Sequence, residues 1–165
     1  MTIAVIAFAF GQQQQYTPGP SNEAIGTAAL RIRRMTKGVL ATQWEVDVFL
    51  RTVRQPADFV VSEYGTESHY LTTEQAFTKS LEYFDSLGDI DEIVLVAHPV
   101  HLMVLRHVMK RWNGYSRYRF TRRYDYMLRQ IPWDRSRGNT QRWTRGFLRF
   151  VIYLAKASLT GQHGE

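Results

Sequence analysis

Two histidines followed by an arginine form the most chemically informative group in the sequence. His98 and His101 come directly after an apolar run, and Arg106 lies one turn and a half further along. Histidine is the usual general acid or base near neutral pH, and arginine is a preferred clamp for anions. The same pattern also fits a histidine at a helix start and a solvated arginine. We expect no metal here, because no third histidine or nearby carboxylate completes a familiar zinc pattern.

Polar side chains also follow two other apolar runs. Gln43 and Glu45 come directly after one run. Gln43 is a candidate ligand-binding residue, and Glu45 is either a second catalytic carboxylate or a first-turn residue that suits the helix dipole. Thr72, Thr73 and Glu74 precede a long amphipathic run. Their hydroxyls and amides are suited to binding an anion, with Glu74 as an alternative catalytic carboxylate, but the three residues equally suit a simple helix cap.

Gly11 ends the first apolar run of the chain. A glycine at this place lets the backbone approach a ligand closely. However, the sequence has neither the Gly-x-Gly-x-x-Gly pattern nor a Walker lysine, so ordinary dinucleotide or nucleoside triphosphate binding has little support.

The elements that must position these residues alternate between strands and helices. Apolar runs predict strands over residues 1–10, 39–44, 58–61 and 91–97, with a fifth, outer strand over 115–120. Helical spacing predicts helices over residues 22–36, 45–53, 76–88, 100–112 and 141–160, the last of them basic and amphipathic. Ser21 and Asn22 are good N-cap residues for the first helix. The alternation predicts an α/β fold, a Rossmann-like three-layer αβα sandwich with a mostly parallel sheet of about five strands, in one domain over 1–165.

In such a sheet, ligands bind outside the carboxyl ends of the strands. All the polar groups named above follow strands or begin helices at that edge. No single motif is specific, so the prediction of a binding site depends on their convergence.

Composition narrows the class of protein and partner. The chain has no cysteine, which excludes disulfides and thiolate chemistry and fits a reducing, cytoplasmic compartment. The apolar start is too short for a membrane span and lacks the features of a signal peptide. Residues 1–100 carry 7 Lys/Arg and 12 Asp/Glu, whereas residues 101–165 carry 14 and 3. The basic half suits a phosphorylated ligand, an acidic partner or an anionic surface.

Several segments together resemble the YdcF/SanA/ElyC-like family, the domain of unknown function 218. They are the opening strand that ends at Gly11, PGPSNEAI, TQWE, YLTTEQAF, VLVAHPVHLMVLRHV and IPWDRSRGNTQRWTRGFLRF. The resemblance implies a Rossmann-like fold with a polar pocket over the strand ends. It places these residues on the family's polar positions: Gly11, Asn22, Glu45, Thr73, Glu74, His101 and Arg106. It also implies S-adenosylmethionine or a nucleotide as a ligand, but the family's envelope-bound members have an N-terminal anchor that this sequence lacks.

The sequence is compatible with three functions. The first is an enzyme, a transferase or hydrolase acting on a small anionic metabolite that is phosphorylated or nucleotide-like, with a histidine as acid or base and Arg106 as clamp. The second is a non-catalytic module that senses such a ligand. The third is a protein that binds nucleic acid or a membrane surface through its basic, aromatic C-terminal half. The basic residues are spread over several elements, which disfavours nucleic acid and leaves peripheral membrane contact open.

Overall fold

A computed structural model describes residues 2–11, 17–62, 72–111, 118–135, 139 and 141–160. Five strands form one sheet in the order β3-β2-β1-β4-β5, and every neighbouring pair is parallel. The strands are β1 (Ile3–Ala7), β2 (Val39–Gln43), β3 (Phe59–Val61), β4 (Glu92–Val96) and β5 (Arg119–Thr121). The predicted fold class, a Rossmann-like α/β fold, is confirmed.

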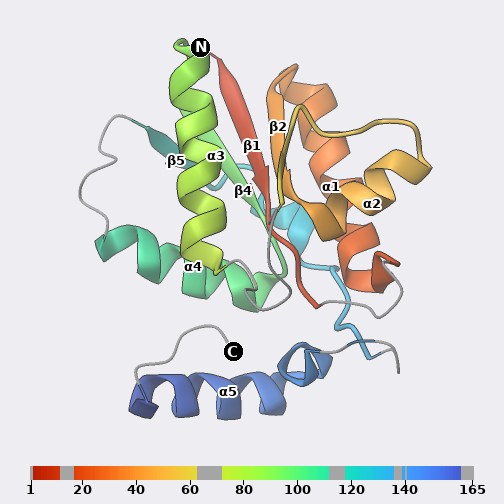
Figure 1. The fold of residues 1–165 in the computed structure, drawn as a ribbon, viewed down its shortest axis with the longest axis vertical. Helices are drawn as coiled ribbons and strands as arrows, with labels where there is room; N and C mark the ends of the chain where they lie inside the picture. The colour runs from red at the N-terminus through yellow and green to blue at the C-terminus, as the bar shows by residue number, and fades with distance from the viewer. Residues whose placement is uncertain are drawn as a thin grey trace.

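In the described ranges, five α-helices accompany the sheet: α1 (Gly19–Thr36), α2 (Trp44–Thr52), α3 (Thr73–Leu87), α4 (Pro99–Arg111) and α5 (Phe147–Thr160). Figure 1 shows α1 and α2 on one side of the sheet, with α3 and α4 on the other. This arrangement follows from right-handed crossovers, because the chain winds outward from β1 to β3 and then returns to place β4 on the other side of β1. Two short 3-10 helices, Asp125–Leu128 and Arg142–Arg145, lie in the C-terminal third.

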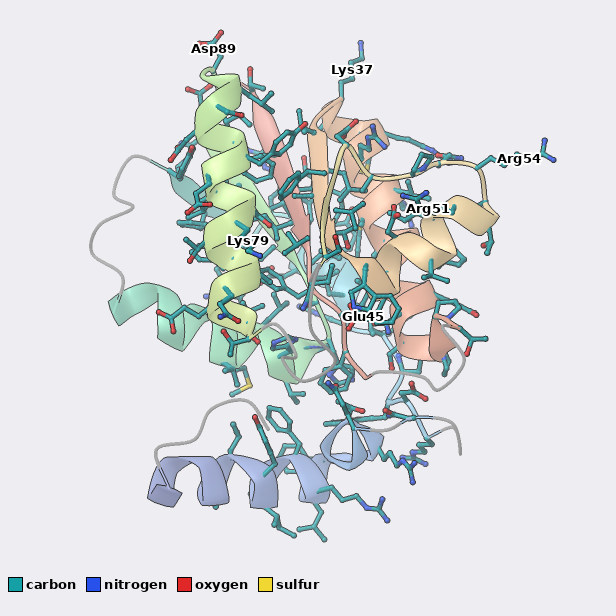
Figure 2. The ribbon with its side chains drawn as sticks, viewed as in Figure 1. Lys37, Glu45, Arg51, Arg54, Lys79 and Asp89 are labelled. Carbon is teal, nitrogen blue, oxygen red and sulfur yellow. The ribbon has the colours of Figure 1, made fainter. Side chains whose placement is uncertain are left out.

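The two ends of the sheet differ in character. Lys37 and Asp89, in the turns that lead into β2 and β4, project outward at the amino ends of the strands (Figure 2). Glu45, at the carboxyl end of β2, is instead only 3% exposed. Buried polar side chains are expected at a functional edge more than at a merely solvated one.

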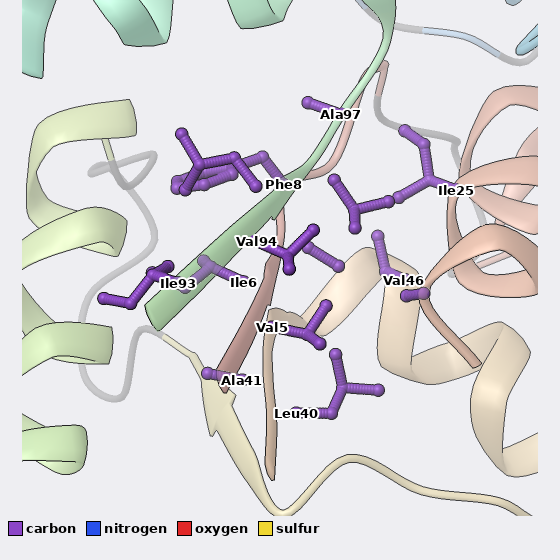
Figure 3. Close-up of a cluster of buried hydrophobic side chains, with 14 of the residues drawn as sticks. Val5, Ile6, Phe8, Ile25, Leu40, Ala41, Val46, Ile93, Val94 and Ala97 are labelled. Atoms are coloured by element: carbon purple, nitrogen blue, oxygen red, sulfur yellow. The ribbon is translucent and has the colours of Figure 1, made fainter. Parts of the chain in front are cut away.

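The sheet core is formed by alternating side chains of the central strands. In Figure 3, Val5 and Leu40 point toward the α1 and α2 side, whereas Ile6 and Ile93 point toward α3. All four side chains are at most 1% exposed. Because both faces of β1 and β4 are covered, these strands appear in the sequence as continuous apolar runs without alternation.

The structure corrects several predicted boundaries. β1 ends at Ala7 and not at residue 10, and α1 begins at Gly19, three positions before the predicted helix. Ser21 and Asn22 therefore lie inside α1, which has no side-chain cap. The predicted helix over 141–160 is divided by Gly146, whose extended backbone separates the 3-10 helix from α5. The predicted fifth strand is present as β5, although residues 115–117 of the prediction lie outside the described residues.

Candidate functional site

The segment that leaves β1 is held by side chains of two other elements. The Ala9 amide donates a hydrogen bond to Oε1 of Gln43 at 2.8 Å, and the Phe10 amide donates to Oδ1 of Asn22 at 2.8 Å. Nδ2 of Asn22 in turn donates to the Gly11 carbonyl at 2.8 Å. The Phe8 amide still donates to the Val96 carbonyl of β4 at 2.8 Å, and from Ala9 onward these contacts replace the strand ladder, which explains why β1 is shorter than its apolar run. Asn22 and Gln43, both predicted as ligand-binding residues, thus fix the backbone of the site.

Gly11 lies against a group of polar side chains from the C-terminal third, which we call the polar loop cluster: Asp134, Asn139 and Thr144. All three are at most 2% exposed. Nδ2 of Asn139 donates to Oγ1 of Thr144 at 2.6 Å and to the Asp134 carbonyl at 2.9 Å. The cluster ties Asp134, Asn139 and Thr144 to the segment after β1. A hydrogen bond from Ser21 Oγ to the Pro132 carbonyl at 2.6 Å ties the preceding residues to α1.

Gly11 is required for this contact for two reasons. Its φ is +90°, in the region that favours glycine, and an added Cβ would lie 3.1 Å from a side-chain atom of each of the three cluster residues. Gly88 has almost the same backbone angle, φ +88°, but nothing lies within 4 Å of its Cβ position.

We therefore expect Gly11→Ala to lower the free energy of unfolding by about 2 kcal/mol and Gly88→Ala by about 1 kcal/mol. Both variants incur the backbone cost, and only the first also crowds the polar loop cluster. Urea unfolding of both variants measures the difference. Equal losses would show that the cluster moves aside without cost.

Two predicted histidines lie in a second group, which we call the histidine cluster: His98, His101, Thr73, Phe10 and Trp133. The His98 ring stacks on Phe10, with centroids 4.1 Å apart and planes 7° from parallel, and Trp133 packs against it at 4.4 Å. Nε2 of His101 is 3.0 Å from Oγ1 of Thr73, so α4 and α3 meet through this hydrogen bond. Phe10 links the histidine cluster to α1, because its amide donates a hydrogen bond to Asn22 and its ring contacts His98.

Burial makes both histidines poor bases. Desolvation lowers the pKa of His98 from 6.5 to about 4, helped by the neighbouring His101. Desolvation also lowers the pKa of His101 from 6.5 to about 4, although a backbone hydrogen bond with Ala9 opposes the shift. Both imidazoles are therefore neutral at pH 7. Nδ1 of His98 is buried and has no hydrogen-bond partner among the described residues.

Four predicted site residues have other surroundings. Thr72 is the N-cap of α3 in a capping box with Gln75, which supports the structural alternative for this residue. Glu74 is exposed in the first turn of α3, and Glu45 is buried in the first turn of α2. Arg106 forms an ion pair with Asp125 at 2.5 Å, so a carboxylate of the protein already occupies the proposed anion clamp.

The helices at this edge differ in their first turns. α2 and α3 carry acidic residues there, which suit the positive end of a helix dipole, whereas α1 and α4 carry none. α1 and α4 follow β1 and β4, the two strands between which the winding direction reverses. Within the described ranges, no group of three or more His, Asp or Glu side chains is placed to hold a metal ion.

Sequence reasoning missed the polar loop cluster and Trp133. The sequence carried one signal for them, the late segment IPWDRSRGNTQRWTRGFLRF with its closely spaced polar and aromatic residues. Nothing in that segment indicated contact with Gly11, more than 120 positions earlier.

Comparisons of the chain with known proteins identify no relative. No family model matches the chain, and no match was found among curated proteins or solved structures.

Proposed function

We propose that the protein binds a small anionic molecule, phosphorylated or nucleotide-like, at the carboxyl ends of β1 and β4. The observation that carries this proposal is a buried imidazole nitrogen at that place, Nδ1 of His98, which has no hydrogen-bond partner among the described residues. Buried polar atoms normally have hydrogen-bond partners, and a ligand is one way to supply them. In sheets of this order the ligand site lies where the winding direction reverses, which here is between β1 and β4.

The charge at this edge supports an anionic ligand. The amino ends of α1 and α4 point there without a first-turn carboxylate, so their amides and dipoles favour a negative group. A neutral histidine donates or accepts a hydrogen bond without bringing a charge of its own. Membership of the YdcF-like family, with S-adenosylmethionine or a nucleotide as ligand, is part of the proposal and rests on the short shared motifs alone.

Thr73→Val tests the site with a matched control on the same helix. The variant removes the hydroxyl that binds His101, and we expect it to weaken binding of an anionic ligand by about tenfold, the scale of one lost hydrogen bond. Thr78→Val removes a hydroxyl that binds only the Glu74 carbonyl of its own helix, and affinity should be unchanged. Calorimetry with inorganic phosphate, nucleoside monophosphates and S-adenosylmethionine provides the measurement. If none of these ligands binds the wild type, or if both variants bind equally, the proposed site is wrong.

One observation favours a catalytic function at the same place. A threonine hydroxyl 3.0 Å from a neutral imidazole is the arrangement of a nucleophile and its base. A pKa of about 4 lets His101 accept a proton at pH 7 but gives it little driving force. Hydrolysis of p-nitrophenyl phosphate or acetate that is lost in His101→Gln would support an enzyme, and binding without turnover would support a sensing module.

A further inference from the structure

α5 is attached to the rest of the protein along one side only. Phe150 is 5% exposed and its ring lies 6.3 Å from that of Trp133, and Leu154 also packs against the core. Figure 1 shows α5 running across the end of the molecule toward which the strands point. Trp133 contacts His98 as well as Phe150, so α5 lies on the same side as the histidine cluster.

The remaining surface of α5 carries an exposed apolar stripe, which we define as Phe147, Leu148, Val151 and Ile152. Their exposed fractions are 65%, 71%, 42% and 48%. Residues four apart lie one above the other on a helix, so these two pairs form one continuous surface. Elsewhere in the described part of the chain, large apolar side chains are exposed only at scattered positions. A contiguous apolar patch on a folded protein is typical of a surface that binds a partner or a membrane.

The net charge of the C-terminal segment that contains the stripe indicates which of these it binds. Residues 135–164 contain six Lys/Arg and no Asp or Glu, and exposed Arg149 follows Phe147 and Leu148 on α5. A second copy of the chain would bring the same positive charges together, which disfavours self-association. Anionic headgroups complement them, and long basic side chains can reach headgroups while the apolar residues beside them enter the acyl boundary.

The length of α5 is compatible with a helix lying in the interface. It has 14 residues, far fewer than the roughly 20 needed to cross a bilayer. No helix in the described ranges has both the length and the apolar character of a membrane span. We propose that the apolar stripe of α5 docks the protein peripherally on an anionic lipid bilayer. This inference does not depend on the proposed ligand site.

Sedimentation of the full chain with lipid vesicles tests the docking. We expect binding to vesicles that mix phosphatidylglycerol with phosphatidylcholine, little binding to phosphatidylcholine alone, and weakening by salt. The double variant Leu148→Glu/Ile152→Glu should lose about tenfold or more in affinity. Met35→Glu is the matched control, because Met35 is a 55% exposed apolar residue on α1, and its vesicle affinity should equal that of the wild type.

Leu148 and Ile152 are both exposed, so replacing them should not disturb the core. Circular dichroism checks that the variants remain folded. Leu148→Ser/Ile152→Ser repeats the test without adding negative charge and should show the same direction of loss. The proposal is overturned if the wild type ignores anionic vesicles, or if the stripe variants bind them as well as Met35→Glu does. A stripe variant that changes only the oligomeric state, measured by analytical ultracentrifugation, would likewise overturn it and assign the stripe to a second copy of the chain.

Discussion

The free energy of unfolding is expected to fall by several kcal/mol as the pH is lowered from 6.5 toward 4, because two buried histidines resist protonation in the folded protein. The pKa of His98 and of His101 is lowered to about 4, whereas an unfolded histidine has a pKa of 6.5. Each unit of pKa shift corresponds to about 1.4 kcal/mol, so each histidine contributes about 3 kcal/mol across this window.

The sign follows from proton binding. Between pH 6.5 and 4 the unfolded chain binds protons at both histidines and the folded chain does not, so acid favours unfolding. The contribution of the two histidines to the free energy of unfolding is complete above pH 6.5. It is lost as the pH falls toward 4, the pKa of both histidines in the folded protein. Carboxylates titrate in part of the same range, and the experiment must separate the two contributions.

The variant His98→Phe separates the histidine contribution from the carboxylate contribution. The replacement keeps an aromatic ring next to Phe10 and Trp133 and removes one titrating group. Urea unfolding at several pH values should show a pH dependence that is shallower than that of the wild type by up to about 1.4 kcal/mol per pH unit. NMR titration of the ring protons should place His98 and His101 well below ordinary histidines. An unchanged pH dependence in His98→Phe would assign the acid sensitivity to other groups.

The fold could be predicted because its strands and helices differ strongly in pattern. β1 and β4 are short apolar runs covered on both faces, and α1 and α3 have apolar residues at helical spacing. Their alternation leaves few topologies once crossovers are right-handed. The boundaries were less accurate because side chains compete with the backbone for hydrogen bonds. Asn22 was predicted as a helix cap, but its side chain forms hydrogen bonds with the backbone of Phe10 and Gly11 in the segment after β1.

The site could be predicted only in part, for a related reason. Residues at or shortly after the carboxyl end of a strand are placed by the fold, which is why Gly11, Gln43 and His98 lie at one edge of the sheet. Arg106 is two turns into α4, where its surroundings depend on a distant carboxylate. The Arg106–Asp125 ion pair and the contact of Gly11 with Asp134 join elements whose separation along the chain no local pattern records.

Asn22→Ala is expected to lower the free energy of unfolding by about 2–5 kcal/mol. The Asn22 side chain is fully buried and satisfies two backbone groups, the Phe10 amide and the Gly11 carbonyl. Each buried polar group that loses its partner costs about 1–3 kcal/mol, and bulk water does not reach these two groups because the position is fully buried. The change should also release Phe10 from its position against His98, and ligand affinity at the proposed site should fall with stability.

Two further variants make this prediction specific. Thr27→Ala removes an exposed hydroxyl of α1 that binds only the Glu23 carbonyl, and it should change stability by no more than about 0.5 kcal/mol. Asn22→Asp keeps the acceptor for the Phe10 amide but places a second carboxylate oxygen against the Gly11 carbonyl, which repels it. A protonated aspartic acid would instead donate a hydrogen bond to that carbonyl, as asparagine does. The stability difference between Asn22→Asp and the wild type should therefore narrow as the pH falls. If Asn22→Ala is as mild as Thr27→Ala, other contacts hold the segment after β1, and the candidate site does not depend on Asn22.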